Sequence, residues 1–238
     1  MKFAENITRI SVKSMASACA LALVLGLASQ QAAALGSTTY GFYNITHNNP
    51  TNKVDGETNL KVEVIELTNP NQVRFKFTNN STSSLTDVYF DDGSLLGISS
   101  ISDSGAGISF SQDAAPPNLP GGNNANPPFV VTAGFSADSD APTATNGVTM
   151  GEWLAIDFNL INGKTYINVL SALALPNDGG TGDLRIGVHV QSFVNGGSGS
   201  FINESTVSPV PEADAWVMMV AGLGLVGFMA RRKRYEAA

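Results

Sequence analysis

The chain has 238 residues, of which 20 are acidic and 13 basic, so its formal net charge is −7. Residues 35–209 hold 16 of the acidic and only 6 of the basic residues, which gives this middle region a net charge of −10. Such an acidic surface repels phosphate, which excludes nucleic acid as a partner. The single cysteine is Cys19, near the N-terminus. We therefore expect no disulfide, no cysteine chemistry and no cofactor in the exported part.

Residues 1–34 are typical of a secretory signal peptide. Three basic residues precede an apolar run at residues 15–27, and three alanines follow at residues 32–34. The run is short for a membrane span, and small residues after it are what signal peptidase requires. We expect cleavage after Ala34; the alternative is a retained N-terminal anchor.

A second apolar stretch lies at residues 213–230, where Asp214 is the only charged residue. As a helix it would be about 27 Å long at about 1.5 Å per residue, which just crosses the hydrocarbon core of a bilayer. Trp216 would then lie at the outer headgroups of the inner membrane. Four basic residues follow and predict a cytoplasmic end: Arg231, Arg232, Lys233 and Arg234.

The tripeptide Val210-Pro211-Glu212, the apolar stretch and the basic cluster, in this order, resemble the PEP-CTERM sorting signal of exported proteins of Gram-negative bacteria. The resemblance is confined to residues 210–234. It implies processing near the Pro-Glu pair by an exosortase, a membrane-embedded cysteine transpeptidase. The usual motif is Pro-Glu-Pro, whereas this chain has Ala213 in place of the second proline. An ordinary tail anchor or stop-transfer helix is the alternative.

The region between the two ends is predicted to be all-β, an antiparallel β-sandwich of the jelly-roll kind. Residues 35–209 contain 20 glycines and 20 asparagines, and short alternating runs are separated by turn-forming clusters. The predicted plan has four parts: a signal peptide (1–34), the β-sandwich domain (35–204), a linker with the Pro-Glu pair (205–212), and a transmembrane helix with a basic tail (213–238).

The clearest predicted hairpin joins residues 60–67 (LKVEVIEL) to residues 72–78 (QVRFKFT) through Thr68-Asn69-Pro70-Asn71. If Leu67 faces Gln72, period-two alternation predicts three opposed pairs: Val64 with Phe75, Val62 with Phe77, and Glu63 with Lys76. The first two pairs belong to a core face and the third to a charged face.

A second hairpin is predicted from residues 152–161 (EWLAIDFNLI) and residues 164–172 (KTYINVLSA). They are joined by Asn162-Gly163, the pair that a type I′ turn prefers because both positions need positive φ. This register places Phe158 opposite Ile167 on the core face.

The other face of the second hairpin carries the candidate binding residues of the domain. The register places Asn159 opposite Tyr166 and Asp157 opposite Asn168, with Trp153 opposite an alanine. Aromatic rings beside amide and carboxylate groups suit the C–H faces and hydroxyls of sugars. These five residues are therefore candidate glycan contacts; the alternative is the ordinary half-polar outside of a sandwich.

A further core strand is expected at residues 184–190. Its inward residues are Leu184, Ile186, Val188 and Val190, and its outward residues Arg185 and His189 are expected to face solvent. A role of His189 as a base or ligand is the alternative. Residues 114–128 contain five prolines and are expected to form a long surface loop.

Two acidic turns supply the oxygen ligands that calcium prefers, namely Asp91-Asp92-Gly93 and the run at residues 177–183. Ordinary turns account for both, and calcium binding is the alternative. The second run departs from the calcium nonapeptide repeat at Leu184 and occurs only once.

Three functions fit these observations. The preferred one is a non-catalytic bacterial protein of the cell surface or extracellular matrix. Its expected partners are signal peptidase, exosortase, the inner membrane as a transient anchor, and exopolysaccharide. A glycan-binding module using Trp153 and Tyr166 is the alternative. A secreted hydrolase with paired carboxylates is less favoured because no nucleophile elbow, metal-ligating pair or phosphate loop is present.

Overall fold

The computed structural model describes residues 35–91, 95–105, 107–132, 134–175 and 183–207. The predicted signal peptide, residues 208–212 of the predicted linker, and the predicted transmembrane helix with its basic tail lie outside these ranges, whereas residues 205–207 belong to strand β10. Within them, no helix is both long and apolar enough to cross a membrane. The strands and helices described below therefore belong to the predicted β-domain.

Ten strands make up most of the domain: β1 (Ser37–Asn44), β2 (Leu60–Glu66), β3 (Gln72–Asn79), β4 (Ser84–Asp91), β5 (Leu95–Asp103), β6 (Phe110–Gln112), β7 (Ser136–Ser139), β8 (Trp153–Leu160), β9 (Arg185–Gln191) and β10 (Gly199–Val207). Three α-helices and one 3₁₀ turn connect them: α2 (Pro50–Asn59), α3 (Thr143–Asn146), α4 (Tyr166–Leu173) and η1 (Gly122–Asn124). The all-β class was predicted correctly.

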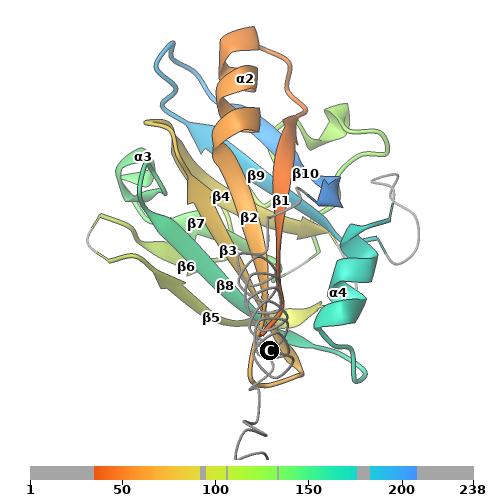
Figure 1. Cartoon of the computed structure of the whole chain (residues 1–238). Helices are drawn as coiled ribbons and strands as arrows, with labels where there is room; N and C mark the ends of the chain where they lie inside the picture. Colours follow the sequence, from red (N-terminus) through yellow and green to blue (C-terminus); the bar gives the residue numbers. More distant parts are fainter. Residues whose placement is uncertain (1–34, 92–94, 106, 133, 176–182, 208–238) are drawn as a thin grey trace, which may run out of the picture. The chain divides into compact units, whose positions relative to one another are not determined.

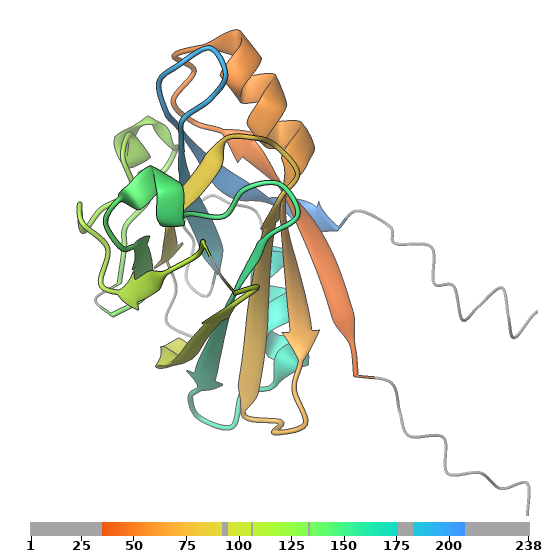
Figure 2. The same cartoon turned by 90° about the vertical axis from the view of Figure 1, so that its left-hand side faces the viewer.

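All ten strands belong to a single antiparallel sheet with the order β5-β8-β3-β2-β1-β10-β9-β4-β7-β6. This differs from the predicted sandwich of two separate sheets. The sheet curls so that its end strands β5 and β6 contact each other (Figures 1 and 2). Strands that are distant in the sheet order thus face one another across one core.

The core lies on the inner face of this curled sheet. Phe75 on β3 and Phe90 on β4 have ring centroids 5.2 Å apart, although four strands separate β3 from β4 in the sheet order. Phe158 on β8 packs edge-on against both rings, at 5.7 and 4.6 Å. Edge-to-face contacts of this kind favour a defined packing of the two halves of the sheet.

The predicted β2–β3 hairpin is confirmed residue by residue. Val62 pairs with Phe77, Glu63 with Lys76, and Val64 with Phe75. The four apolar members of these pairs are fully buried, whereas Glu63 and Lys76 are half-buried on the outer face. The period-two pattern was sufficient here because each strand has one apolar and one charged face.

The second predicted hairpin is wrong beyond its turn. Asn162 and Gly163 do have positive φ, at 51° and 68°. The segment that follows forms helix α4 instead of a strand, and β8 pairs with β3 on one side and β5 on the other. Since β8 has no free edge, residues 164–172 cannot pair with it, and Phe158 does not face Ile167.

Helix α4 has sequence signals of its own. Thr165 and Asn168 form a capping box at its N-terminus, with the Thr165 amide donating to Asn168 Oδ1 over 2.9 Å. Tyr166, Val169 and Leu173 are buried at helical spacing. Ile167, predicted to be in the core, is 62% exposed.

Candidate functional site

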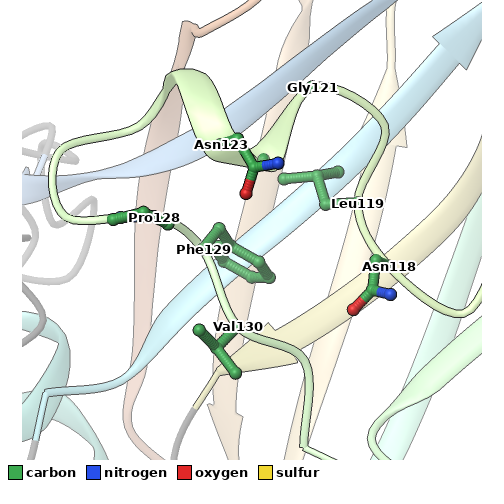
Figure 3. A pocket seen from close by; sticks show the side chains of 8 residues that line it. Asn118, Leu119, Gly121, Asn123, Pro128, Phe129 and Val130 are labelled. Carbon is green, nitrogen blue, oxygen red and sulfur yellow. The ribbon is translucent and has the colours of Figure 1, made fainter.

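The outer face of β4, β9 and β10 is covered by the loop between β6 and β7, here called the cover loop (residues 113–132). Its side chains Leu119, Phe129 and Ala114 form a second, smaller core with Tyr89 of β4, Ile202 of β10 and Ile45, which directly follows β1. The surface loop predicted for residues 114–128 is present, with the 3₁₀ turn η1 inside it, and its apolar side chains Leu119 and Phe129 pack on the sheet. Figure 3 shows it crossing the strands.

Gly187 on β9 makes this close packing possible. A Cβ atom at this position would lie 2.8 Å from Leu119 Cδ2 and 3.0 Å from Phe129 Cζ. Such distances are too short for non-bonded carbon atoms. The missing side chain at Gly187 therefore provides the space that the two loop side chains fill.

Arg185 fixes the C-terminal half of the cover loop. Its guanidinium donates to the carbonyls of Pro127 and Pro128 over 3.0 and 2.9 Å, and it pairs with Asp91 through Nε (3.0 Å) and Nη2. It also lies 5.3 Å from the centroid of the Phe129 ring. Arg185 faces outward as predicted, but the prediction of solvent exposure was wrong, because the loop leaves it only 3% exposed.

The N-terminal part of the loop is fixed by β4 and β7. The Ala114 amide donates to Ser136 Oγ over 3.0 Å, and the Ala115 amide donates to Asp138 Oδ2 over 3.2 Å. The Tyr89 hydroxyl donates to the Pro116 carbonyl over 3.0 Å. Both ends of the cover loop are thus held by specific polar contacts with the sheet.

A row of ionisable groups runs beneath this N-terminal part. Asp138 on β7 is paired with Asp87 on β4, and Asp87 with His189 on β9. His189 Nδ1 lies 3.0 Å from Asp87 Oδ2, which also accepts from Thr86 Oγ1 over 2.7 Å. The expectation that His189 faces solvent was therefore wrong: it is buried against a carboxylate.

Asp87 influences the pKa of two neighbouring side chains, Asp138 and Tyr89. Burial, and then the nearby charge of Asp87, raise the pKa of Asp138 above its ordinary value. Burial and the same charge also raise the pKa of the Tyr89 hydroxyl. Asp138 Oδ1 is buried and has no hydrogen-bond partner among the described residues.

Ser200 on β10 lies opposite His189 at the other end of the row. It is fully buried, and its Oγ has no hydrogen-bond partner in the part of the chain that the structure describes. A nucleophilic triad needs the serine hydroxyl within hydrogen-bond reach of the imidazole. The order serine, histidine, aspartate is present across these strands, but the serine–histidine contact is not made.

The cover loop itself lines a partly open hollow of about 300 Å³. The Gly122 carbonyl accepts from the amides of Ala125 and Phe129, both over 3.1 Å, which closes the loop into a ring. In Figure 3, the side chains of Leu119 and Phe129 lie between those of Asn118 and Asn123. The residues around the hollow are Asn118, Leu119, Gly121, Gly122, Asn123, Pro128, Phe129 and Val130.

The five predicted glycan contacts do not form the predicted surface. Trp153, Asp157 and Asn159 lie on one face of β8. Asp157 accepts two hydrogen bonds from Arg74 (2.7 and 2.9 Å), and Asn159 accepts one from Gln72 (2.8 Å). The Trp153 ring is covered by Lys76, whose Nζ lies 5.3 Å from the ring centroid.

The other two predicted contacts belong to α4 and serve its structure. The Tyr166 hydroxyl is 2.9 Å from Thr38 Oγ1, and its ring is buried. Asn168 is part of the capping box. Because residues 164–172 are helical, Tyr166 and Asn168 do not lie opposite Asn159 and Asp157.

The described residues contain no cluster of ligands for the calcium ion that the two acidic turns suggested. Asp91 is paired with Arg185, while Asp92, Gly93 and residues 177–182 lie outside the described ranges. Among the residues that the structure describes, no group of three or more histidine, cysteine, aspartate or glutamate side chains is placed to hold a metal ion.

Sequence reasoning missed the cover loop as a built element. The sequence contained part of the evidence for its packing: Leu119 and Phe129 are apolar residues within a stretch otherwise rich in proline, glycine and asparagine. Their partner Gly187 lies more than fifty residues further along the chain. The composition of the loop gives no information about this distant partner.

Comparison with known proteins identifies the C-terminal segment. The model of a family described as the PEP-CTERM protein-sorting motif matches residues 209–234. No curated protein and no solved structure matches the chain. The resemblance noted from Val210, Pro211, Glu212 and the segment after them is confirmed, and this signal implies export, membrane transit and processing by an exosortase in bacteria.

Proposed function

We propose that this protein is a non-catalytic component of the cell surface or extracellular matrix of a Gram-negative bacterium, where it associates with exopolysaccharide. The signal peptide at residues 1–34 directs export, and the apolar stretch at residues 213–230 anchors the chain transiently in the inner membrane. The observation that carries the proposal is the sorting motif at residues 209–234. A protein with this signal reaches the exosortase with its body already outside the membrane.

The arrangement of Asp87 and Asp138 supports a body without catalysis. Hydrolysis by paired carboxylates needs two groups that flank a substrate. Asp87 is 1% exposed and is bound by Thr86 and His189, while the Ala115 amide of the cover loop donates to Asp138. These groups hold a loop on the sheet, which is a structural task.

The acidic charge of the domain supports an extracellular, well-hydrated setting. Residues 35–209 carry a net charge of −10, and such a surface stays soluble and resists self-association. Glycan binding through Trp153 and Tyr166 is disfavoured, because Trp153 lies on β8 and Tyr166 on α4 and the two side chains do not share a face.

Replacement of Pro211 and Glu212 by alanine tests the sorting step. The double variant should be exported but not processed, so that precursor accumulates in the inner membrane while wild-type protein is released. Ser208→Ala, next to the matched segment, is the control and should be processed normally. Cell fractions are compared by immunoblotting with an antibody against the β-domain. Normal processing and release of the double variant would overturn the proposal.

A further inference from the structure

The hollow in the cover loop has fixed walls and unused polar side chains. Arg185 holds the carbonyls of Pro127 and Pro128 on one side. Asn118 and Asn123 are exposed, and no hydrogen bond within the described residues engages their side-chain amides. A pocket that is already formed and whose amides are free can bind a ligand at little cost in reorganisation.

The chemistry of the hollow indicates the class of ligand. No charged side chain occurs between residues 114 and 131, and the nearby Arg185 is neutralised by Asp91. Each amide can donate and accept hydrogen bonds, and in Figure 3 the two amides lie on opposite sides of Leu119 and Phe129. Val130, 62% exposed, adds apolar surface at the rim. These features match an uncharged ring that has hydroxyl groups on its edge and C–H groups on its face.

The volume of the hollow and the net charge of the domain narrow the class of ligand further. A volume of about 300 Å³ is at the lower end for small-molecule sites, which suits a single ring. The net charge of −10 on residues 35–209 repels anionic polysaccharides. A neutral sugar has the required combination of size, hydroxyl groups and absence of charge.

We propose that the hollow of the cover loop binds one neutral sugar ring of an exopolysaccharide, with Asn118 and Asn123 as the hydrogen-bonding side chains. This site rests on the proposed extracellular function, because exopolysaccharide meets the protein only outside the cell. It differs from the surface that the sequence predicted: it is built from the β6–β7 loop and contains none of the five predicted residues.

The test uses protein recovered outside the producing cells and the polysaccharide of the same strain, separated by anion exchange into neutral and acidic fractions. Binding of each fraction to immobilised protein is measured by biolayer interferometry. The variant Asn118→Ala/Asn123→Ala should bind the neutral fraction at least about tenfold more weakly, since two amide hydrogen bonds are lost. Asn124→Ala, an exposed amide of the same loop that does not line the hollow, is the control and should bind normally.

Saturable binding of the neutral fraction that depends on Asn118 and Asn123 would support the site. Absence of such binding, binding of the acidic fraction alone, or unchanged binding by the double variant would overturn it. Thermal unfolding of each variant confirms that the domain is intact. The sorting step is judged separately, because the loop variants should be processed like wild type. If wild-type protein is processed and released but does not bind the neutral fraction, only the sugar site fails.

Discussion

The second strand of the β2–β3 hairpin and the segment that follows β8 were both predicted to be hairpin strands, but their structures differ. Both contain a β-branched, partly alternating run after a turn rich in asparagine. The first run pairs as predicted, with Val64 opposite Phe75, whereas the second becomes α4. The difference shows that alternation predicts a strand only where a neighbouring strand has a free edge.

The neighbours of each segment explain the two outcomes. β2 pairs with β1 along one edge and with β3 along the other, so the predicted partner β3 meets a free edge of β2. β8 is already paired with β3 and β5. Residues after Gly163 can then bury apolar surface only by packing on the sheet, and the capping box at Thr165 starts a helix that does so.

The largest expected effect comes from the core of the first hairpin. Phe75→Ala removes a fully buried ring that contacts Phe90 and Phe158, so the free energy of unfolding should fall by about 3–5 kcal/mol. Ile167→Ala sharpens the comparison: on the exposed face of α4 it should change stability by less than about 0.5 kcal/mol. Both are measured by urea denaturation. A loss at Ile167 as large as that at Phe75 would mean that residues 164–172 form a buried strand after all.

The second-largest loss of stability is expected at Arg185, on the outer face of the sheet. Arg185→Ala leaves Asp91 and two loop carbonyls without their buried partner and should cost about 3 kcal/mol. It should also speed proteolysis of the cover loop. Arg185→Lys keeps the charge but not the fork of donors, and should recover only part of the loss. Equal stability of the three proteins would show that the loop is not held by this residue.

A smaller effect is expected at the start of α4. Thr165→Ala removes one member of the capping box and should lower stability by about 1 kcal/mol, while Thr165→Ser should be close to wild type. Urea denaturation measures both. If alanine and serine are equivalent at this position, the cap does not stabilise the helix.

The smallest effect is a pH dependence on the outer face. Burial and Asp87 raise the pKa of Asp138 above 3.8 in the folded chain. Its contribution to stability is therefore present at low pH and is lost as pH rises through the folded pKa. The neighbouring groups Asp87, Tyr89, Asp140 and His189 remain in the variant Asp138→Asn. The stability of wild type minus that of this variant should decrease with rising pH; a constant difference between pH 3 and pH 7 would contradict the raised pKa.

The two faces of the sheet also differ in how far they could be predicted. On the inner face, alternation identified Val62, Val64, Phe75 and Phe77, and it placed Ile186 and Val188 correctly as well. On the outer face, the same rule assigned His189 to solvent. The rule failed there because burial on that face depends on the cover loop, whose contacts join distant parts of the chain.

The candidate sites also differ in whether they could be predicted from local sequence. The sorting motif at residues 209–234 is local in sequence and was predicted. The hollow of the cover loop was not, since it requires Arg185 and Gly187 of β9 to hold residues 119 to 129 in place. Local motifs can be identified from sequence, but sites assembled by tertiary contacts need the fold.

Intact-mass analysis of the protein recovered outside the cells tests the sorting route most directly. We predict a chain that begins after Ala34 and ends near Pro211-Glu212, without the apolar stretch at residues 213–230. A freely soluble extracellular chain that still ends at Ala238 would contradict processing by an exosortase.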